Sequence, residues 1–104
     1  MSISVSICDS VASISMSGRF DFHVHREFKE AYSALLVNAD VCEIEIEMSQ
    51  VDYLDSSALG MLILLNERAK EAKKSIILLS PSSVVAQVLD VANFSKIFNI
   101  KHAI

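Results

Sequence analysis

Two stretches near the start of the chain alternate between apolar and polar residues. In residues 3–8 and 12–17 every second side chain is apolar, and most intervening positions are serine. A period of two is typical of a β-strand with one buried face. Asp9 and Ser10 separate the two stretches, so the pattern predicts an antiparallel β-hairpin that ends at Gly18. We expect residues 18–22 to form a loop.

The hydrophobic period changes to that of a helix at about residue 24, where one face carries Phe28, Tyr32 and Leu35. Residues 38–40 should end this helix. Residues 42–48 alternate again, with glutamate at every second position. Because a strand covered on both faces would be apolar throughout, this pattern predicts a sheet with one solvated face. That glutamate face is either simply solvated, which also discourages edge pairing, or an acidic docking surface.

The second half of the chain continues with alternating helices and strands. The strand over 42–48 should end near Met48, followed by a polar turn and an apolar helix from about Ser57 to residue 73. Residues 76–79 are uniformly apolar and predict a buried strand. Pro81 is typical of a helix start, and the next helix should cover about 84–92. Residues 94–100 form a short final segment, which we expect to be a strand.

This order predicts an α/β fold in a single domain spanning residues 1–104. Strands separated by helices pair in parallel through right-handed crossovers, whereas the first hairpin is antiparallel. We therefore expect a mixed sheet of four or five strands with helices mainly on one face. A length of 104 residues and an apolar fraction of 52% suit one folded domain with one core.

Charge and targeting signals narrow the possible functions. The net charge is −4 with no run of lysine or arginine, which argues against nucleic-acid binding and favours a protein partner. We expect no signal peptide, because the first residues show no charged segment followed by an apolar run. The longest apolar run, residues 61–65, is too short for membrane insertion. We expect a cytoplasmic protein whose two cysteines, Cys8 and Cys42, are buried free thiols.

Catalytic and metal motifs are weak in this chain. The serines lack the Gly-x-Ser-x-Gly spacing of a hydrolase, and the three histidines are not placed beside them. His23 and His25 could supply two metal ligands, but no third ligand shares their spacing. No Walker or dinucleotide glycine pattern is present. We therefore expect no enzymatic activity, no metal and no cofactor.

The most informative stretch is the polar turn at Asp55, Ser56 and Ser57. It precedes an apolar helix, where free backbone N–H groups and the positive end of the helix dipole point. Such residues commonly cap a helix. The same position also suits a phosphate. Local sequence leaves both roles open.

The segment from Tyr53 to Met61, YLDSSALGM, resembles the signature of bacterial anti-sigma-factor antagonists, the small stand-alone STAS domains. Residues 18–21, GRFD, resemble the second motif of that family, a loop after the second strand. Ser80 and Pro81 before the last long helix also match. The resemblance extends over essentially the whole chain. It implies a STAS fold and a role in signal transduction and transcription regulation.

The resemblance also implies a mechanism called partner switching. Members are phosphorylated on the hydroxyl residue after the motif aspartate, here Ser56, with Ser57 the less favoured position. The kinase is a partner anti-sigma factor with a histidine-kinase-like ATPase fold, and a PP2C-type phosphatase resets the switch. The unphosphorylated antagonist binds the kinase and frees its client. Ser57 would cap the helix. The partner-binding residues implied are Asp21, Asp55, Ser56, Ser57, Ala58, Leu59 and Met61.

Two alternatives accompany this interpretation, and one position departs from the family pattern. The domain could be an unmodified STAS scaffold, such as an accessory subunit of a lipid-transport complex. It could instead bind a small ligand or nucleotide in the loops around Asp21 and Asp55. Ala58 stands where the family usually has glycine, and alanine favours the helix by about 1 kcal/mol.

Overall fold

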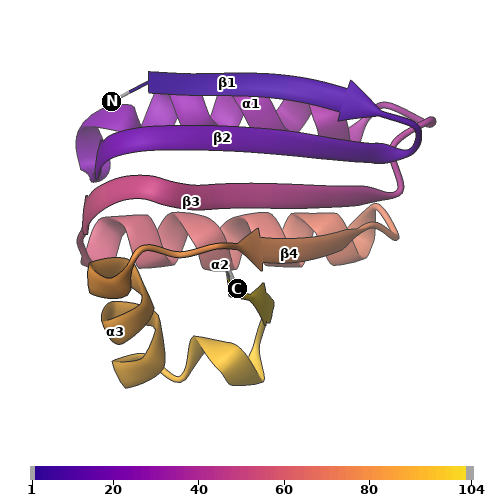
Figure 1. Ribbon diagram of the computed structural model, residues 1–104. Coiled ribbons are helices and arrows are strands. Elements are labelled where there is room, and N and C mark those ends of the chain that lie inside the picture. The colour runs from indigo at the N-terminus through magenta and orange to yellow at the C-terminus, as the bar shows by residue number, and fades with distance from the viewer. Residues whose placement is uncertain (1, 103–104) are drawn as a thin grey trace.

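The computed structural model describes residues 2–102, which form a five-stranded sheet with strand order β1-β2-β3-β4-β5 (Figure 1). β1 pairs with β2 in antiparallel fashion, and every later pair is parallel. The α/β class and the mixed sheet are therefore confirmed. The strands are β1 (Ser2–Cys8), β2 (Val11–Phe20), β3 (Glu43–Leu54), β4 (Ser75–Leu79) and β5 (Asn99–Lys101).

Helices connect the parallel strands, and α1 and α2 lie together on one side of the sheet (Figure 1). The long helices are α1 (His25–Leu36), α2 (Ser56–Glu71) and α3 (Ser83–Val91). Two single turns of 3-10 helix, η1 (Phe22–Val24) and η2 (Phe94–Lys96), precede α1 and β5. The expected strand over residues 94–100 is therefore a helical turn followed by a three-residue strand.

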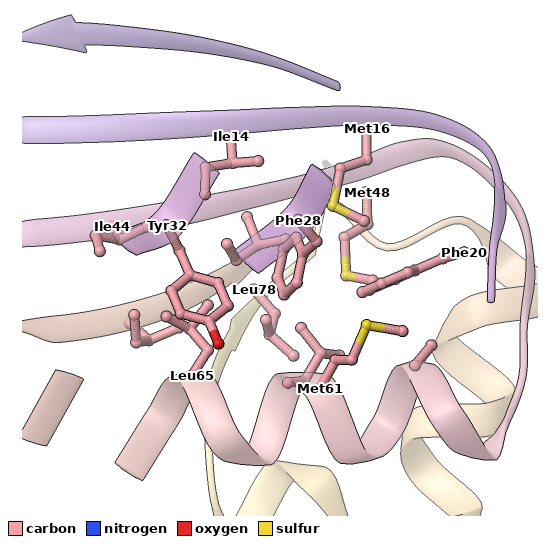
Figure 2. Packing of buried hydrophobic residues seen from close by; sticks show 14 of the residues in the cluster. Ile14, Met16, Phe20, Phe28, Tyr32, Ile44, Met48, Met61, Leu65 and Leu78 are labelled. Carbon is pink, nitrogen blue, oxygen red and sulfur yellow. The ribbon is translucent and has the colours of Figure 1, made fainter. Parts of the chain in front are cut away.

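The hydrophobic core fills the space between the sheet and these helices (Figure 2). Ile14 and Ile44 contribute from the strands, Phe28 and Tyr32 from α1, and Leu65 from α2, each with at most 2% of its surface exposed. Glu43, Glu45 and Glu47 occupy the opposite face of β3, where they are half-buried. The alternating pattern therefore predicted correctly which side of this strand meets the core.

β3 is longer than its sequence pattern indicates, and the expected end at Met48 is wrong. The pairs Ser15–Glu47 and Ser17–Gln50 show that two steps along β2 correspond to three along β3. A second extra residue follows, because Gly18 pairs with Val51 and Arg19 with Tyr53. Each β-bulge interrupts the period of two and bends the strand. The strand thus continues to Leu54 while its alternation is lost.

The expected loop over residues 18–22 is also wrong, because β2 continues to Phe20. Gly18 has φ 95°, a left-handed conformation that glycine adopts without the strain a side chain would cause. Glycine therefore marks an irregularity inside this strand rather than its end. The expectation for the cysteines was half right: Cys8 and Cys42 are free thiols, but both are exposed.

Candidate functional site

The ends of β2 and β3 bring two aspartates to the same edge of the sheet. Phe20 and Leu54 are the last paired residues, and the Asp55 N–H donates to the carbonyl of Phe20 at 3.4 Å. Asp21 and Asp55 each follow directly. Because β2 and β3 are parallel, their ends lie next to each other. The helical turn η1 after β2 and the helix α2 after β3 therefore start from neighbouring positions. Residues distant in sequence thereby share one surface.

Asp55 caps α2. Its backbone is extended (φ −107°, ψ −177°), and its carboxylate Oδ1 accepts a hydrogen bond from the Ala58 N–H at 2.9 Å. The expected role of Ser57 as the cap is therefore wrong. The helix begins at Ser56, one residue earlier than expected, so the carboxylate of Asp55 is the side chain that reaches the third N–H of the helix.

This cap leaves the two serine hydroxyls outside the capping hydrogen bond. Ser56 is the first helical residue and is exposed, whereas Ser57, the second, is half-buried. Both stand at the positive end of the helix dipole. Of the two hydroxyls, that of Ser56 is the more accessible to another protein.

Asp21 caps the η1 turn and holds two neighbouring side chains. Its Oδ1 accepts from the His23 N–H at 3.0 Å and lies 3.3 Å from His23 Nδ1, while Oδ2 lies 3.6 Å from Arg19 Nε. Desolvation by itself would raise the pKa of Asp21, but the hydrogen bonds and charge of His23, together with Arg19, lower it overall. Asp21 is therefore an ionised carboxylate at this edge.

Arg19 and Tyr53 join the site although neither was expected there. They are paired residues of β2 and β3, and the Arg19 guanidinium lies 4.0 Å from the centre of the Tyr53 ring. This distance is suitable for a cation–π contact. Their pairing depends on the second bulge of β3, which the sequence pattern did not reveal. The family resemblance included both positions but gave no role to either.

The remaining predicted contact residues divide between surface and core. Leu59 is half-buried and lines a mainly apolar hollow of about 400 Å³ with Gln87, Val88 and Val91 of α3 and with Ala92, the residue after this helix. Ala58 and Met61 are 0% and 7% exposed, and Figure 2 shows Met61 pointing toward Phe20 and Met48. These two side chains pack in the core between α2 and the sheet. Their expected role as direct partner contacts therefore does not fit this conformation.

The site presents the exposed hydroxyl of Ser56 directly after the Asp55 carboxylate, whose Oδ1 accepts the hydrogen bond from the Ala58 N–H. Its charged residues are mostly acidic, with Asp21, Asp52 and Asp55 around the strand ends and Arg19 already paired with Asp21. Within residues 2–102, no three potential ligands of the His, Cys, Asp and Glu types are grouped to hold a metal. None of the helices described is long and apolar enough to span a membrane.

Comparison with known proteins identifies the family. The model of the family described as "Mlab, STAS domain" matches residues 3–100. A STAS-domain containing protein of Pseudomonas aeruginosa strain UCBPP-PA14 is 37% identical over 87 residues, which cover 84% of each chain. The chain belongs to the STAS domain family.

Solved structures show the same fold at lower identity. The anti-sigma factor antagonist SpoIIAA in its unphosphorylated form has a TM-score of 0.80 at 18% identity, covering 95% of this chain and 87% of SpoIIAA. The phosphorylated form of the Bacillus protein has a TM-score of 0.74 at 17% identity, with coverages of 95% and 90%. An anti-sigma factor antagonist from Mycobacterium paratuberculosis has a TM-score of 0.80 at 21% identity, covering 99% and 86%.

Proposed function

We propose that this protein is the phosphorylatable antagonist of a partner-switching pathway. In its unphosphorylated form it binds a serine kinase with a histidine-kinase-like ATPase fold, and the kinase then releases its client, a sigma factor in the simplest case. Phosphorylation of Ser56 ends this binding, and a PP2C-type phosphatase restores it. The proposal combines the membership of the STAS family with the geometry at the start of α2.

One observation carries the proposal: Asp55, rather than a serine, caps α2. The exposed Ser56 hydroxyl is therefore available as a phosphoryl acceptor without loss of the helix cap. In the transfer, the Ser56 Oγ bonds to the γ-phosphorus of ATP, its proton passes to a base of the kinase, and ADP leaves. Asp55 keeps its hydrogen bond to the Ala58 N–H throughout.

The phosphate should change binding rather than folding. It adds about −1.5 to −2 charges and three acceptor oxygens. The helix dipole favours it by about 0.3–1 kcal/mol, while the neighbouring carboxylate of Asp55 opposes it. Because these two effects nearly cancel, we expect the folded domain to be little altered. A phosphate placed in an interface against an acidic or apolar surface costs several kcal/mol.

The surroundings of Ser56 suit a protein partner. Leu59, three residues after Ser56, lines an apolar hollow together with the C-terminal end of α3 and Ala92. Val91 is 84% exposed, so its side chain leaves an accessible apolar surface at this hollow. We therefore include Leu59 and this hollow, with Asp21, Asp55, Ser56 and Ser57, in the proposed contact surface.

The decisive experiment is mass spectrometry of the protein purified from its own cells in several growth states. The intact mass should include a species heavier by one phosphoryl group, which phosphatase treatment removes. Trypsin releases Ser56 in the segment between Lys29 and Arg68, which also contains Ser33, Ser49 and Ser57. Fragmentation should assign the phosphate to Ser56. Ser56→Ala should abolish it, whereas Ser83→Ala, at the equivalent position of α3, should not.

A chain that carries no phosphate under any growth condition would contradict the proposal. The alternative is then an unmodified STAS scaffold, such as an accessory subunit of a lipid-transport complex. In that case the protein should copurify in fixed stoichiometry with its complex, and Ser56→Asp should leave the association intact. Ligand-dependent thermal stabilisation would instead favour a small-molecule binding module.

A further inference from the structure

The edge strand β1 has unpaired backbone groups along its outer side. β1 lies at the margin of the sheet and pairs only with β2, and no described loop donates to or accepts from its backbone (Figure 1). Natural edge strands are usually protected by shortness, lysine, proline or a bulge. β1 has seven residues, none charged and none proline, and its register with β2 runs without a shift.

The other edge of the sheet is protected by comparison. β5 has three residues and ends in Lys101. Strand addition there would gain few hydrogen bonds and would place a charge in the new ladder. A copy of this chain therefore has one open edge, and pairing of β1 with itself closes the assembly at two subunits. An interface between β1 and β5 would instead leave open edges and continue into a fibre.

The sequence of β1 matches itself when one copy is turned antiparallel to the other. With Val5 opposite Val5 of the second copy, Ile3 meets Ile7, and Ser4 meets Ser6. Apolar side chains stay together on the helix-facing side, and serines stay together on the outer side. Directly opposite pairs of this kind stabilise an antiparallel ladder. A shift by one residue would place each apolar side chain opposite a serine or cysteine.

The exposure of apolar residues on β1 also supports a second copy of this chain as the partner. Val5 and Ile7 are 44% and 48% exposed although they share a face with the buried Ile14 and Ala12, their register partners on β2. The helices cover β2 fully but leave this part of β1 open. A second copy would cover Val5 and Ile7, and it would extend the sheet from five strands to ten.

We propose that two copies of this protein pair through β1 in antiparallel fashion about Val5. The interface is small, so we expect a weak dimer with a dissociation constant on the order of 10–100 μM. This inference does not depend on the proposed function. α2 starts from the end of β3, and β2 lies between β3 and the edge strand β1, so the start of α2 stays accessible in the dimer (Figure 1).

Disulfide trapping tests the register. In a background with Cys8→Ser and Cys42→Ser, Val5→Cys should form a covalent dimer rapidly under mild oxidation. Directly opposite Cα atoms in an antiparallel pair lie about 4.5–5.5 Å apart, within reach of a disulfide. Ile3→Cys and Ile7→Cys should each crosslink slowly alone but rapidly when mixed. Val37→Cys is the matched control, because Val37 is 85% exposed and lies outside β1.

Sedimentation equilibrium of the unmodified protein between 10 μM and 1 mM tests the dimer itself. The average mass should rise toward that of two chains, and Val5→Lys should shift the dissociation constant at least tenfold upward while thermal unfolding stays close to wild type. A monomer over the whole range, or a Val5→Lys variant that still dimerises, would overturn the proposal. Equal crosslinking rates at positions 5 and 37 would do the same.

Discussion

The starts of α2 and α3 are built from similar residues but use them differently. At α2 the sequence is Asp55-Ser56-Ser57, and the aspartate accepts the capping hydrogen bond from the Ala58 N–H at 2.9 Å. At α3 the sequence is Ser82-Ser83, and Ser82 Oγ accepts from the Val85 N–H at 3.4 Å. In both helices the first helical residue is an exposed serine.

The difference lies in which side chain supports the fold. Ser82 Oγ also donates to the Val51 carbonyl at 2.7 Å, so it connects α3 to the irregular end of β3. At α2 the structural role belongs to Asp55, and Ser56 is free for another role. A serine at a helix start is therefore not informative by itself. The residue that takes the cap decides whether the serine next to it is structural or available.

The largest expected effect separates the two exposed serines. Ser56→Asp should weaken binding to the kinase by at least about a hundredfold, or about 2.7 kcal/mol, because it places a charge in the interface. Ser83→Asp adds the same charge to the start of α3 and should change binding less than threefold. Isothermal titration of each purified variant with the kinase that Ser56→Ala captures from its own cells measures both constants.

Thermal unfolding of the same variants provides the folding control. Ser56→Asp should melt close to wild type, since the helix dipole favours the new charge and Asp55 opposes it. If Ser56→Asp melts far below wild type, the loss of binding reflects damage to the fold. If both variants lose binding equally, the site is not specific to α2, and the distinction drawn between the helices is wrong.

The next largest effect concerns the structural serine. Ser82→Ala removes the cap of α3 and the hydrogen bond to the Val51 carbonyl. The free energy of unfolding should therefore fall by about 2 kcal/mol. Urea denaturation at neutral pH measures this change. Ser83→Ala is the matched control and should stay within about 0.5 kcal/mol of wild type. Equal losses in both variants would show that Ser82 has no special role.

Asp55→Ala should lower the free energy of unfolding by about 1 kcal/mol, because the Ala58 N–H loses its capping partner. Asp55→Ser should retain most of the stability, since serine is nearly as good a cap. Ser57→Ala should change the free energy of unfolding by less than about 0.5 kcal/mol. Urea midpoints for the three variants decide the assignment. A larger loss for Ser57→Ala than for Asp55→Ala would restore Ser57 as the cap.

The sequence predicted the fold well because hydrophobic period determines which face of each element is buried. Residues 43–47 alternate between glutamate and apolar side chains, and β3 presents these faces as expected. The same rule failed beyond Met48, where two bulges add residues to β3 that β2 lacks. A bulge depends on pairing with the neighbouring strand, so local periodicity in β3 alone could not reveal it.

The site was predicted only in part, because some of its contacts also depend on the pairing of distant strands. The motif around Ser56 is contiguous and could be read directly, whereas the contact between Arg19 and Tyr53 requires the register of two distant strands. The family resemblance implied Ser57 as the cap, but the helix begins at Ser56, and the residue before it, Asp55, caps the helix. Burial of Ala58 and Met61 likewise follows from the rotation of α2 against the sheet. Sequence motifs identified the region, and packing determined the role of each side chain.

The smallest effect tests a third helix start, the η1 turn capped by Asp21. Because the pKa of Asp21 is lowered in the folded protein, its charge contributes stability that is complete above the unfolded pKa of about 3.9 and is lost as pH falls through the lower native pKa. Asp21→Asn retains an acceptor for the His23 N–H but removes the charge. Wild type should therefore be slightly more stable than Asp21→Asn at pH 7, and the urea midpoints should converge as the pH falls below the unfolded pKa of about 3.9. A difference that stays constant across this range would show that the charge of Asp21 contributes nothing.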